Sequence, residues 1–371
     1  MITAKGAVGE PGWWNGAVTS TQPDVSTEKT APALERSDLD DLRRAAAEVS
    51  RVVVGQYPMV ERLLVALLAR GHCLLEGVPG VAKTLAVRTF ATVVGGSFAR
   101  LQFTPDLVPS DIVGTRIYRA GNETFDIELG PVFVNFVLAD EVNRAPAKVQ
   151  AAMLELMAER QVSLAGRSYP LPEPFIVIAT QNPIESEGVY PLPEAQRDRF
   201  LLKVDVPLPR AHEEAEILRR MSVDPPAARQ VLDPDRVQRL SRAADEVYVH
   251  PLVADYVVRL VMATRAPADY GVGDDVDGVL DVGASPRATL GLVAAARALA
   301  LVRGRDHVLP GDVRELAPDV IAHRLVLGFD AVADGVTAAS VVDRVVAAVR
   351  PPQPADGPGG PGAPGGQQGR W

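Results

Sequence analysis

The chain has 371 residues, of which 47% are hydrophobic and 23% are charged, so it is long and apolar enough to form two hydrophobic cores. Its single cysteine, Cys73, excludes an internal disulfide and a four-cysteine zinc site, and its five histidines form no HExxH motif. The net charge of −9 argues against nucleic acid as a partner, because sequence-independent binding to phosphates needs a basic surface.

The two ends of the chain have the composition of disordered tails. Residues 1–36 are rich in Gly, Pro, Ser and Thr, and residues 351–371 are dominated by Gly and Pro. The pair Trp13–Trp14 is either an exposed pair in the first tail or a docking element for a partner. No stretch has the apolar length of a signal peptide or of a membrane span, so we expect a cytoplasmic protein without membrane insertion.

The pattern of the region between the tails changes once, near Pro209. Before it, short apolar runs such as Phe136–Ala139 alternate with helical stretches such as Lys83–Val94, which predicts an α/β fold with a parallel sheet and flanking helices over residues 37–209. After it, we expect a smaller all-α domain over residues 210–350. Its predicted helices are Glu213–Met221, Pro251–Thr264, Pro286–Arg303, Pro310–Val326 and Val336–Val349.

A glycine-containing loop, Gly77–Thr84, follows the apolar run His72–Glu76 and precedes a helical stretch. Strand, loop and helix in this order are typical of a phosphate-binding loop, whose backbone N–H groups surround the phosphates. Lys83 is suited to reach the β and γ oxygens, and the Thr84 hydroxyl is suited to bind Mg²⁺. The general motif has Gly before the lysine. This chain has Ala82, whose methyl group is tolerable if the residue adopts right-handed helical angles.

Polar side chains follow two further apolar runs. Asp140 and Glu141 come directly after Phe136–Ala139, at the end of a predicted strand where ligands of parallel α/β sheets bind. Asp140 is suited to hold the water shell of Mg²⁺, and Glu141 is suited to orient and deprotonate the attacking water. Asn182 follows Phe175–Ala179 and could hold the same water or the γ-phosphate, although an Asn-Pro pair alone is only a turn signal.

Four longer segments resemble the MoxR branch of the AAA+ ATPases: LLEGVPGVAKT, VLADEVNRAPAKVQAAMLELMAE, VIATQNPIESEGVYPLPEAQRDRF and GASPRA. The resemblance covers residues 37–350 and implies an AAA+ P-loop core followed by a helical lid, with ATP and Mg²⁺ as cofactors. Alanine at position 82 is the form that this branch usually shows. Thr84 and Asp140 are the implied metal ligands. The implied nucleotide-binding residues are Val54, Gly55, Gly77, Val78, Pro79, Gly80, Val81, Ala82, Lys83, Thr84 and Leu85.

The resemblance also implies catalytic roles. Glu141, with Asp140, is identified as the Walker B pair, and Asn182 as sensor 1. Arg199 is the implied arginine finger, which a neighbouring subunit inserts towards the γ-phosphate, and Arg197 is a second candidate for it. Arg287 is the implied sensor 2, which couples the lid to the nucleotide.

Members of this branch act as chaperone-like factors, so the resemblance implies a homo-oligomeric ring, typically a hexamer, that remodels, matures or activates a client complex. A protein with a von Willebrand factor A domain is a common partner. Residues 115–129 and 161–175 each show β-type alternation around a turn signal, which predicts two hairpins. In similar proteins such hairpins face a central pore, although they are also compatible with plain surface hairpins.

Two other function classes stay open. A P-loop phosphotransferase or GTPase is one alternative, but the DxxG match at Asp111–Gly114 is not accompanied by an [NT]KxD motif. A nucleic-acid motor is the other, and the acidic charge of the chain argues against it.

Overall fold

The computed structural model describes residues 36–121, 123–183, 190, 192–273, 276 and 278–353. The predicted tails, with Trp13–Trp14, lie almost entirely outside these residues. Within the described residues, no helix is both long and apolar enough to cross a membrane.

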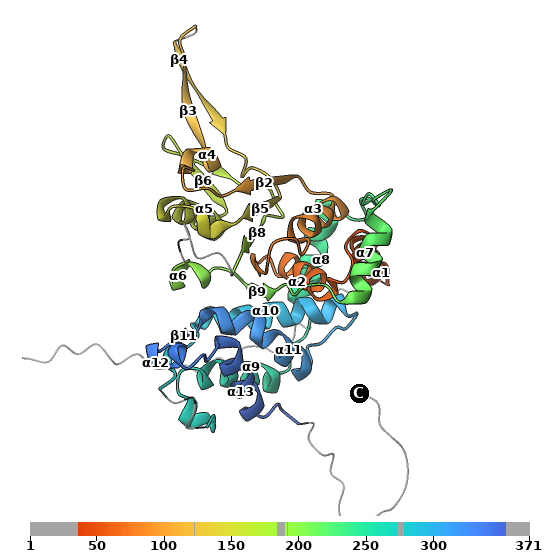
Figure 1. The fold of residues 1–371 in the computed structure, drawn as a ribbon, viewed down its shortest axis with the longest axis vertical. Coiled ribbons are helices and arrows are strands. Elements are labelled where there is room, and N and C mark those ends of the chain that lie inside the picture. The colour runs from red at the N-terminus through yellow and green to blue at the C-terminus, as the bar shows by residue number, and fades with distance from the viewer. Residues whose placement is uncertain are drawn as a thin grey trace, which may run out of the picture. The chain divides into compact units, whose positions relative to one another are not determined.

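A five-stranded parallel sheet occupies the first half of the folded region, with the strand order β2-β5-β8-β1-β9 (Figure 1). In its register, Ala139 lies between Leu101 and Ala179, and Glu76 lies beside Gln181. The carboxyl ends of β1, β5 and β8 therefore meet at one edge, and the predicted parallel sheet is confirmed. The strands are β1 (Cys73–Glu76), β2 (Phe98–Gln102), β5 (Phe136–Asp140), β8 (Ile176–Gln181) and β9 (Leu202–Asp205).

Helices cover both faces of this sheet. Because side chains alternate along a strand, Cys73 and Leu75 belong to one hydrophobic cluster and Leu74 to another. The first cluster contains side chains of α1 (Arg36–Val52), α2 (Tyr57–Leu68) and α3 (Lys83–Val94), whereas the second contains those of α5 (Ala147–Glu159). Two short helices, α4 (Pro109–Val113) and α6 (Glu194–Arg197), and the 3-10 turn η1 (Val142–Arg144) lie in the connections.

The second half of the chain is mainly helical, as predicted. Several helices begin with proline at their first position, where its missing N–H costs no hydrogen bond. The helices are α7 (Ala211–Met221), α8 (Pro234–Glu246), α9 (Pro251–Ala263), α10 (Pro286–Val302), α11 (Pro310–Ile321), α12 (Phe329–Ala333) and α13 (Ala338–Ala348). Two 3-10 turns, η2 (Pro267–Tyr270) and η3 (Ala322–Arg324), accompany them.

The structure departs from the predicted all-α arrangement in three ways. Helices α8 and α12 were not among the five predicted helices. Helix α11 ends at Ile321 instead of Val326, and a short antiparallel pair of strands, β10 (Leu280–Val282) and β11 (Val326–Leu327), follows the turn η3. Strands of two or three residues are too short to show a period of two, so the apolar spacing alone did not reveal them. The division into domains at residues 209 and 210 stays a prediction.

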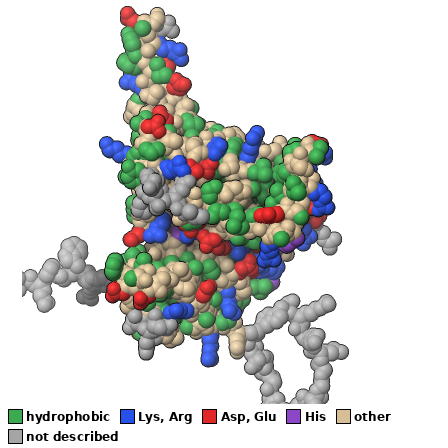
Figure 2. Space-filling model, in the orientation of Figure 1, with side chains coloured by type: hydrophobic (Ala, Val, Ile, Leu, Met, Phe, Trp, Pro, Cys, Tyr) green, Lys and Arg blue, Asp and Glu red, His purple; other side chains and the backbone are tan. Residues whose placement is uncertain are grey.

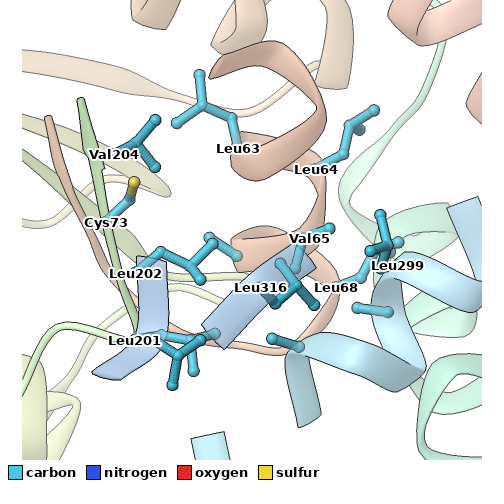
Figure 3. Close-up of a cluster of buried hydrophobic side chains, with 14 of the residues drawn as sticks. Leu63, Leu64, Val65, Leu68, Cys73, Leu201, Leu202, Val204, Leu299 and Leu316 are labelled. Carbon is cyan, nitrogen blue, oxygen red and sulfur yellow. The ribbon is translucent and has the colours of Figure 1, made fainter. Parts of the chain in front are cut away.

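The two halves share one hydrophobic cluster. Figure 3 shows leucines of α2, including Leu64 and Leu68, beside Leu299 of α10 and Leu316 of α11, with β1 and β9 on the other side of α2. Helix α2 is buried on nearly all sides, as its run of apolar residues requires. It therefore joins the sheet to the helical half.

Both predicted hairpins are present as antiparallel pairs, β3 (Gly114–Arg119) with β4 (Thr124–Leu129), and β6 (Gln161–Leu164) with β7 (Arg167–Pro170). The β3–β4 hairpin projects from the sheet and carries hydrophobic and charged side chains on its surface (Figures 1 and 2). Its exposed rings of Tyr118 and Phe125 lie 5.0 Å apart, and the Arg116 guanidinium stacks 3.9 Å from the Phe125 ring. Such contacts give an exposed ribbon some order without a core.

We expect Leu68→Ala to lower the free energy of unfolding by about 2–5 kcal/mol, because a side chain that is only 1% exposed leaves a cavity between α2 and α10. Urea titration followed by circular dichroism measures this change. The matched control is Leu218→Ala, which removes a side chain that is 70% exposed and should change stability by less than about 0.5 kcal/mol. Equal losses in the two variants would contradict the assigned packing.

Candidate active site

A cleft lies at the carboxyl edge of the sheet, over the ends of β1, β5 and β8. Three predicted groups line it together: residues 79–85 of the phosphate loop, the pair Asp140 and Glu141, and Asn182. The parallel strand order explains this convergence, since each group directly follows a strand that ends at the same edge. Residues Arg100, Thr180 and Gln181 complete the lining.

The phosphate loop closely approaches Val206, the residue after β9, at its first glycine. A Cβ atom on Gly77 would come within 2.6 Å of the Val206 carbonyl oxygen, so this position accepts no side chain. Gly80 has φ +87°, a conformation that also favours glycine. The loop then enters α3 at Lys83, which directs the N-terminal N–H groups of a helix into the cleft.

Ala82 adopts left-handed angles, with φ 63° and ψ 22°, at the N-cap of α3. The condition that we attached to this residue, right-handed helical angles, was therefore wrong. The sharp turn from loop to helix demands a positive φ here, which is the reason why the general motif has glycine. An alanine in this region costs roughly 1–2 kcal/mol, so the loop holds local backbone strain beside the cleft.

Lys83 lies within its own loop. Its ammonium group donates to the carbonyl oxygens of Gly77 and Val78, at 3.2 Å for Val78. Partial burial lowers the pKa of Lys83, and the carboxylates of Asp140 and Glu141 oppose this effect. A cation that is partly stripped of water and placed above a helix N-terminus is well suited to meet an anionic ligand.

Asp140 is the buried acid of the cleft. Its Oδ1 accepts a hydrogen bond from the Thr180 hydroxyl at 2.6 Å, and its Oδ2 accepts from Arg100 Nε at 2.9 Å and Nη2 at 2.6 Å. The Thr84 hydroxyl lies 3.4 Å from the same Oδ2. A hydroxyl and a carboxylate side by side are the hard oxygen ligands that Mg²⁺ prefers, so the residues fit the implied metal.

Glu141 stands at the rim of the cleft with a left-handed backbone, φ 57°. Its N–H donates to the Thr180 hydroxyl at 2.9 Å, and its carboxylate accepts from Gln102 Nε2 at 2.8 Å and pairs with Arg144 Nε at 3.1 Å. Thr180 thus holds the backbone of one acid and the side chain of the other. Asn182 is buried beside this pair.

Sequence reasoning missed four of these residues: Arg100, Gln102, Arg144 and Thr180. Arg100 and Gln102 belong to β2, and only the pairing of β2 with β5 brings them to the acids. No motif in the sequence encodes that strand order. A signal did exist for Thr180, because it precedes Asn182 by two positions at the end of a predicted strand.

Arg199 and Arg287 do not line the cleft. They lie together in a second pocket with Met157, Ala158, Asp198, Leu201, Gly291 and Arg324. Arg199 donates to the Leu154 carbonyl oxygen, and Arg287 pairs with Asp198 at 3.4 Å. The role of Arg287 as sensor 2, which couples the lid to the nucleotide, stays a prediction. Arg197 Nε is buried with no hydrogen-bond partner among the described residues, and Arg197 lines neither pocket.

Val54 and Gly55 lie just before α2. A Cβ atom on Gly55 would meet the carboxylate of Glu213 in α7 at 2.6 Å, and the residue has φ +76°. Neither residue lines the cleft, so their adenine contact stays a prediction.

Comparison with known proteins assigns the chain to a family. The chain is 61% identical over 317 residues to Chaperone MoxR1 of Mycobacterium tuberculosis, an alignment that covers 85% of this chain and 84% of that one. This chain is a MoxR-family AAA+ ATPase. It is also 36% identical over 312 residues to Protein MoxR of Methylorubrum extorquens, over 78% of this chain and 90% of the other.

Family models agree with this assignment to MoxR. Residues 72–202 match the ATPase family associated with various cellular activities (AAA), and residues 275–345 match the AAA lid domain. The crystal structure of a candidate ATPase from Cytophaga hutchinsonii superimposes with a TM-score of 0.80 at 42% identity, over 85% of this chain and 96% of that chain. The α/β core with a helical lid, nucleotide binding and ATPase activity follow from the family.

In this MoxR-family ATPase, Ala82→Gly should raise the free energy of unfolding by up to about 1 kcal/mol, because glycine removes the left-handed penalty and gives back part of the gain as chain entropy. Urea denaturation measures the change. Ala151→Gly, on the exposed face of α5, is the matched control and should lower stability by about 1 kcal/mol. The same sign in both variants would argue against a strained loop.

Proposed function

We propose that the chain works as a ring of six identical subunits, in which each subunit completes the active site of its neighbour. The observation that carries this proposal is the separation of two sets of residues. Lys83, Asp140 and Glu141 line one cleft, whereas Arg199 and Arg287 share another pocket of the same chain. A site for a nucleoside triphosphate needs cations near the γ-phosphate. A second copy of the chain can supply Arg199 and Arg287 there.

Within the cleft, we assign ATP to the phosphate loop and Mg²⁺ to Thr84 and Asp140. When bound, Mg²⁺ neutralises charge on the β- and γ-phosphate oxygens. The backbone N–H groups of residues 80–84 and the Lys83 ammonium orient the phosphates. Val54 and Gly55 are assigned to the adenine side, on the strength of the family resemblance alone.

Glu141 is the proposed general base, which accepts a proton from the attacking water, and Asn182 orients that water. Hydrogen bonds from Gln102 and to Thr180 fix the carboxylate and the backbone of residue 141. The chemistry is in-line displacement at the γ-phosphate, for which positioning and charge stabilisation supply most of the rate. Arg199 of the neighbouring subunit stabilises the transition state.

The proposed use of this energy is chaperone-like remodelling, maturation or activation of a client protein complex in the cytoplasm. The name of the mycobacterial relative, Chaperone MoxR1, supports this class of function. The exposed β3–β4 hairpin, with Tyr118 and Phe125 at 53% and 54% exposure, offers a contact surface for a client. A protein with a von Willebrand factor A domain is the proposed partner.

We expect Glu141→Gln to bind ATP but to hydrolyse it roughly 10²–10⁴ times more slowly, because the phosphate and metal ligands remain while the base is lost. Lys83→Ala should lose ATP binding itself. Phosphate release and binding of a fluorescent ATP analogue separate the two effects. Normal turnover in Glu141→Gln would overturn the assigned mechanism.

Arg199→Ala should lower turnover by roughly 10³–10⁵ and leave ATP binding intact, since the side chain acts on the nucleotide of another subunit. Mixing Arg199→Ala with Glu141→Gln subunits should restore part of the activity, because some sites then combine an intact cleft with an intact arginine. The control is Arg219→Ala, whose side chain is 76% exposed. Monomeric protein with unchanged turnover in Arg199→Ala would favour an ordinary phosphotransferase.

Affinity capture with Glu141→Gln in ATP tests the client. We expect a partner complex, including a protein with a von Willebrand factor A domain, to co-purify with this variant because it stays in the ATP-bound form. Lys83→Ala is the control that cannot hold ATP. Identical sets of co-purified proteins from the two variants would contradict a nucleotide-dependent client.

A further inference from the structure

The carboxylate of Asp198 joins three donors from the helical half of the chain. Its oxygens accept hydrogen bonds from Arg324 Nε at 2.9 Å and from the Ser285 hydroxyl at 3.0 Å, and they pair with Arg287 Nη1 at 3.4 Å. Asp198 directly precedes Arg199 in the sequence. Two elements that carry the proposed trans-acting arginines are therefore connected through one side chain.

Arg324 adds further hydrogen bonds to this connection. Its side chain is only 3% exposed, and its guanidinium also donates to the carbonyl oxygens of Phe200 at 2.6 Å, Leu201 at 3.4 Å and Val320. Burial lowers the pKa of Arg324 to about 10, against the opposing effect of Asp198, so the side chain stays charged at neutral pH. One buried cation thus ties the loop after α6 to the end of α11.

The N-terminus of α10 rests on the same loop. Ser285 caps this helix by accepting from the Arg287 N–H at 3.2 Å, while its hydroxyl donates to Asp198. A Cβ atom on Gly291, one turn further along, would lie 3.0 Å from the Leu201 side chain, which shows how closely helix and loop approach. The start of α10 therefore cannot shift without moving the loop that carries Arg199.

We propose that Asp198 and Arg324 are positioning residues for ATP hydrolysis at the neighbouring subunit, which hold Arg199 and Arg287 as one rigid unit. This inference rests on the proposed function, in which those two arginines act on the neighbour's nucleotide.

The charges in this pocket favour that role. Of the described residues that line it, Asp198 is the one carboxylate, beside Arg199, Arg287 and Arg324. If Asp198 served stability alone, its ion pair with the buried Arg324 would be sufficient. This carboxylate also engages the half-exposed Arg287 and the helix cap at Ser285, so it sets the direction of a side chain that reaches solvent. Without its charge, the arginines repel one another.

The test is Asp198→Asn, a change that keeps the shape of the side chain and removes its charge. We expect kcat for ATP hydrolysis to fall by roughly 10- to 100-fold, because a displacement of a reacting group by about 1 Å has an effect of this size. The KM for ATP should change by less than about threefold, because the cleft of the variant subunit is intact. Asp198→Glu should recover part of kcat. The matched control is Asp255→Asn, which removes an exposed carboxylate paired with Arg259 on α9 and should leave kcat unchanged.

Mixed assemblies give the readout that a merely structural role would not move. Asp198→Asn subunits mixed with Glu141→Gln subunits should regain activity, because the first provide an intact cleft and the second provide well-placed arginines. If Glu141→Gln subunits restored activity to Arg199→Ala but not to Asp198→Asn, this inference would be overturned and the proposed function would stand. No recovery in either mixture would overturn both. Wild-type kcat in Asp198→Asn alone would overturn this inference directly.

Binding of a fluorescent ATP analogue reports whether Asp198→Asn is folded. If that variant is not folded, Ser285→Ala provides the test. It removes one hydrogen-bond donor to Asp198 and leaves the charges of Asp198 and Arg324 in place. We then expect a fall in kcat of about 3- to 10-fold with KM for ATP unchanged, restored in part by Glu141→Gln subunits. Unchanged kcat in Ser285→Ala would count against the positioning role.

Discussion

The parallel order of five strands is the constraint on which the rest of this structure depends. Strands β5, β8 and β1 are successive neighbours in the sheet, and their carboxyl ends lie at the same edge. The acids at the end of β5 therefore meet the phosphate loop that follows β1. The hydroxyl of Thr180, at the end of β8, then bonds to both acidic residues. A different strand order would keep every motif and still leave no site, so the catalytic geometry is a property of the sheet.

The chain carries two sets of charge that do not meet within it. The cleft presents a lysine, two carboxylates and a helix N-terminus, which suit a phosphate with its metal ion. The second pocket gathers three arginines around one carboxylate. In the proposed ring, the nucleotide of an adjacent subunit is the anion that these arginines would meet. In that ring, association of the subunits and catalysis would depend on the same contact.

Much of this architecture follows from local patterns, and the exceptions have physical causes. The loop around Lys83, the acids at 140 and 141 and both hairpins were predictable, because each is encoded by neighbouring residues. Arg100 and Gln102 were not, since strand pairing places them. The left-handed angles of Ala82 were misjudged because the turn into α3 overrides the preference of alanine. The links through Asp198 and Arg324 join residues 126 positions apart, and no periodicity reports such a pair.

Helix α2 has a mechanical consequence. Its leucines lie in a continuous apolar layer with α10 and α11, so a swing of these helices away from the sheet would expose that layer to water at about 25 cal/mol for each Å². A movement that keeps α2 packed against α10 and α11 costs less free energy. In the proposed ring, each chain would then move as one rigid body, and ATP hydrolysis would change the angle between neighbouring chains.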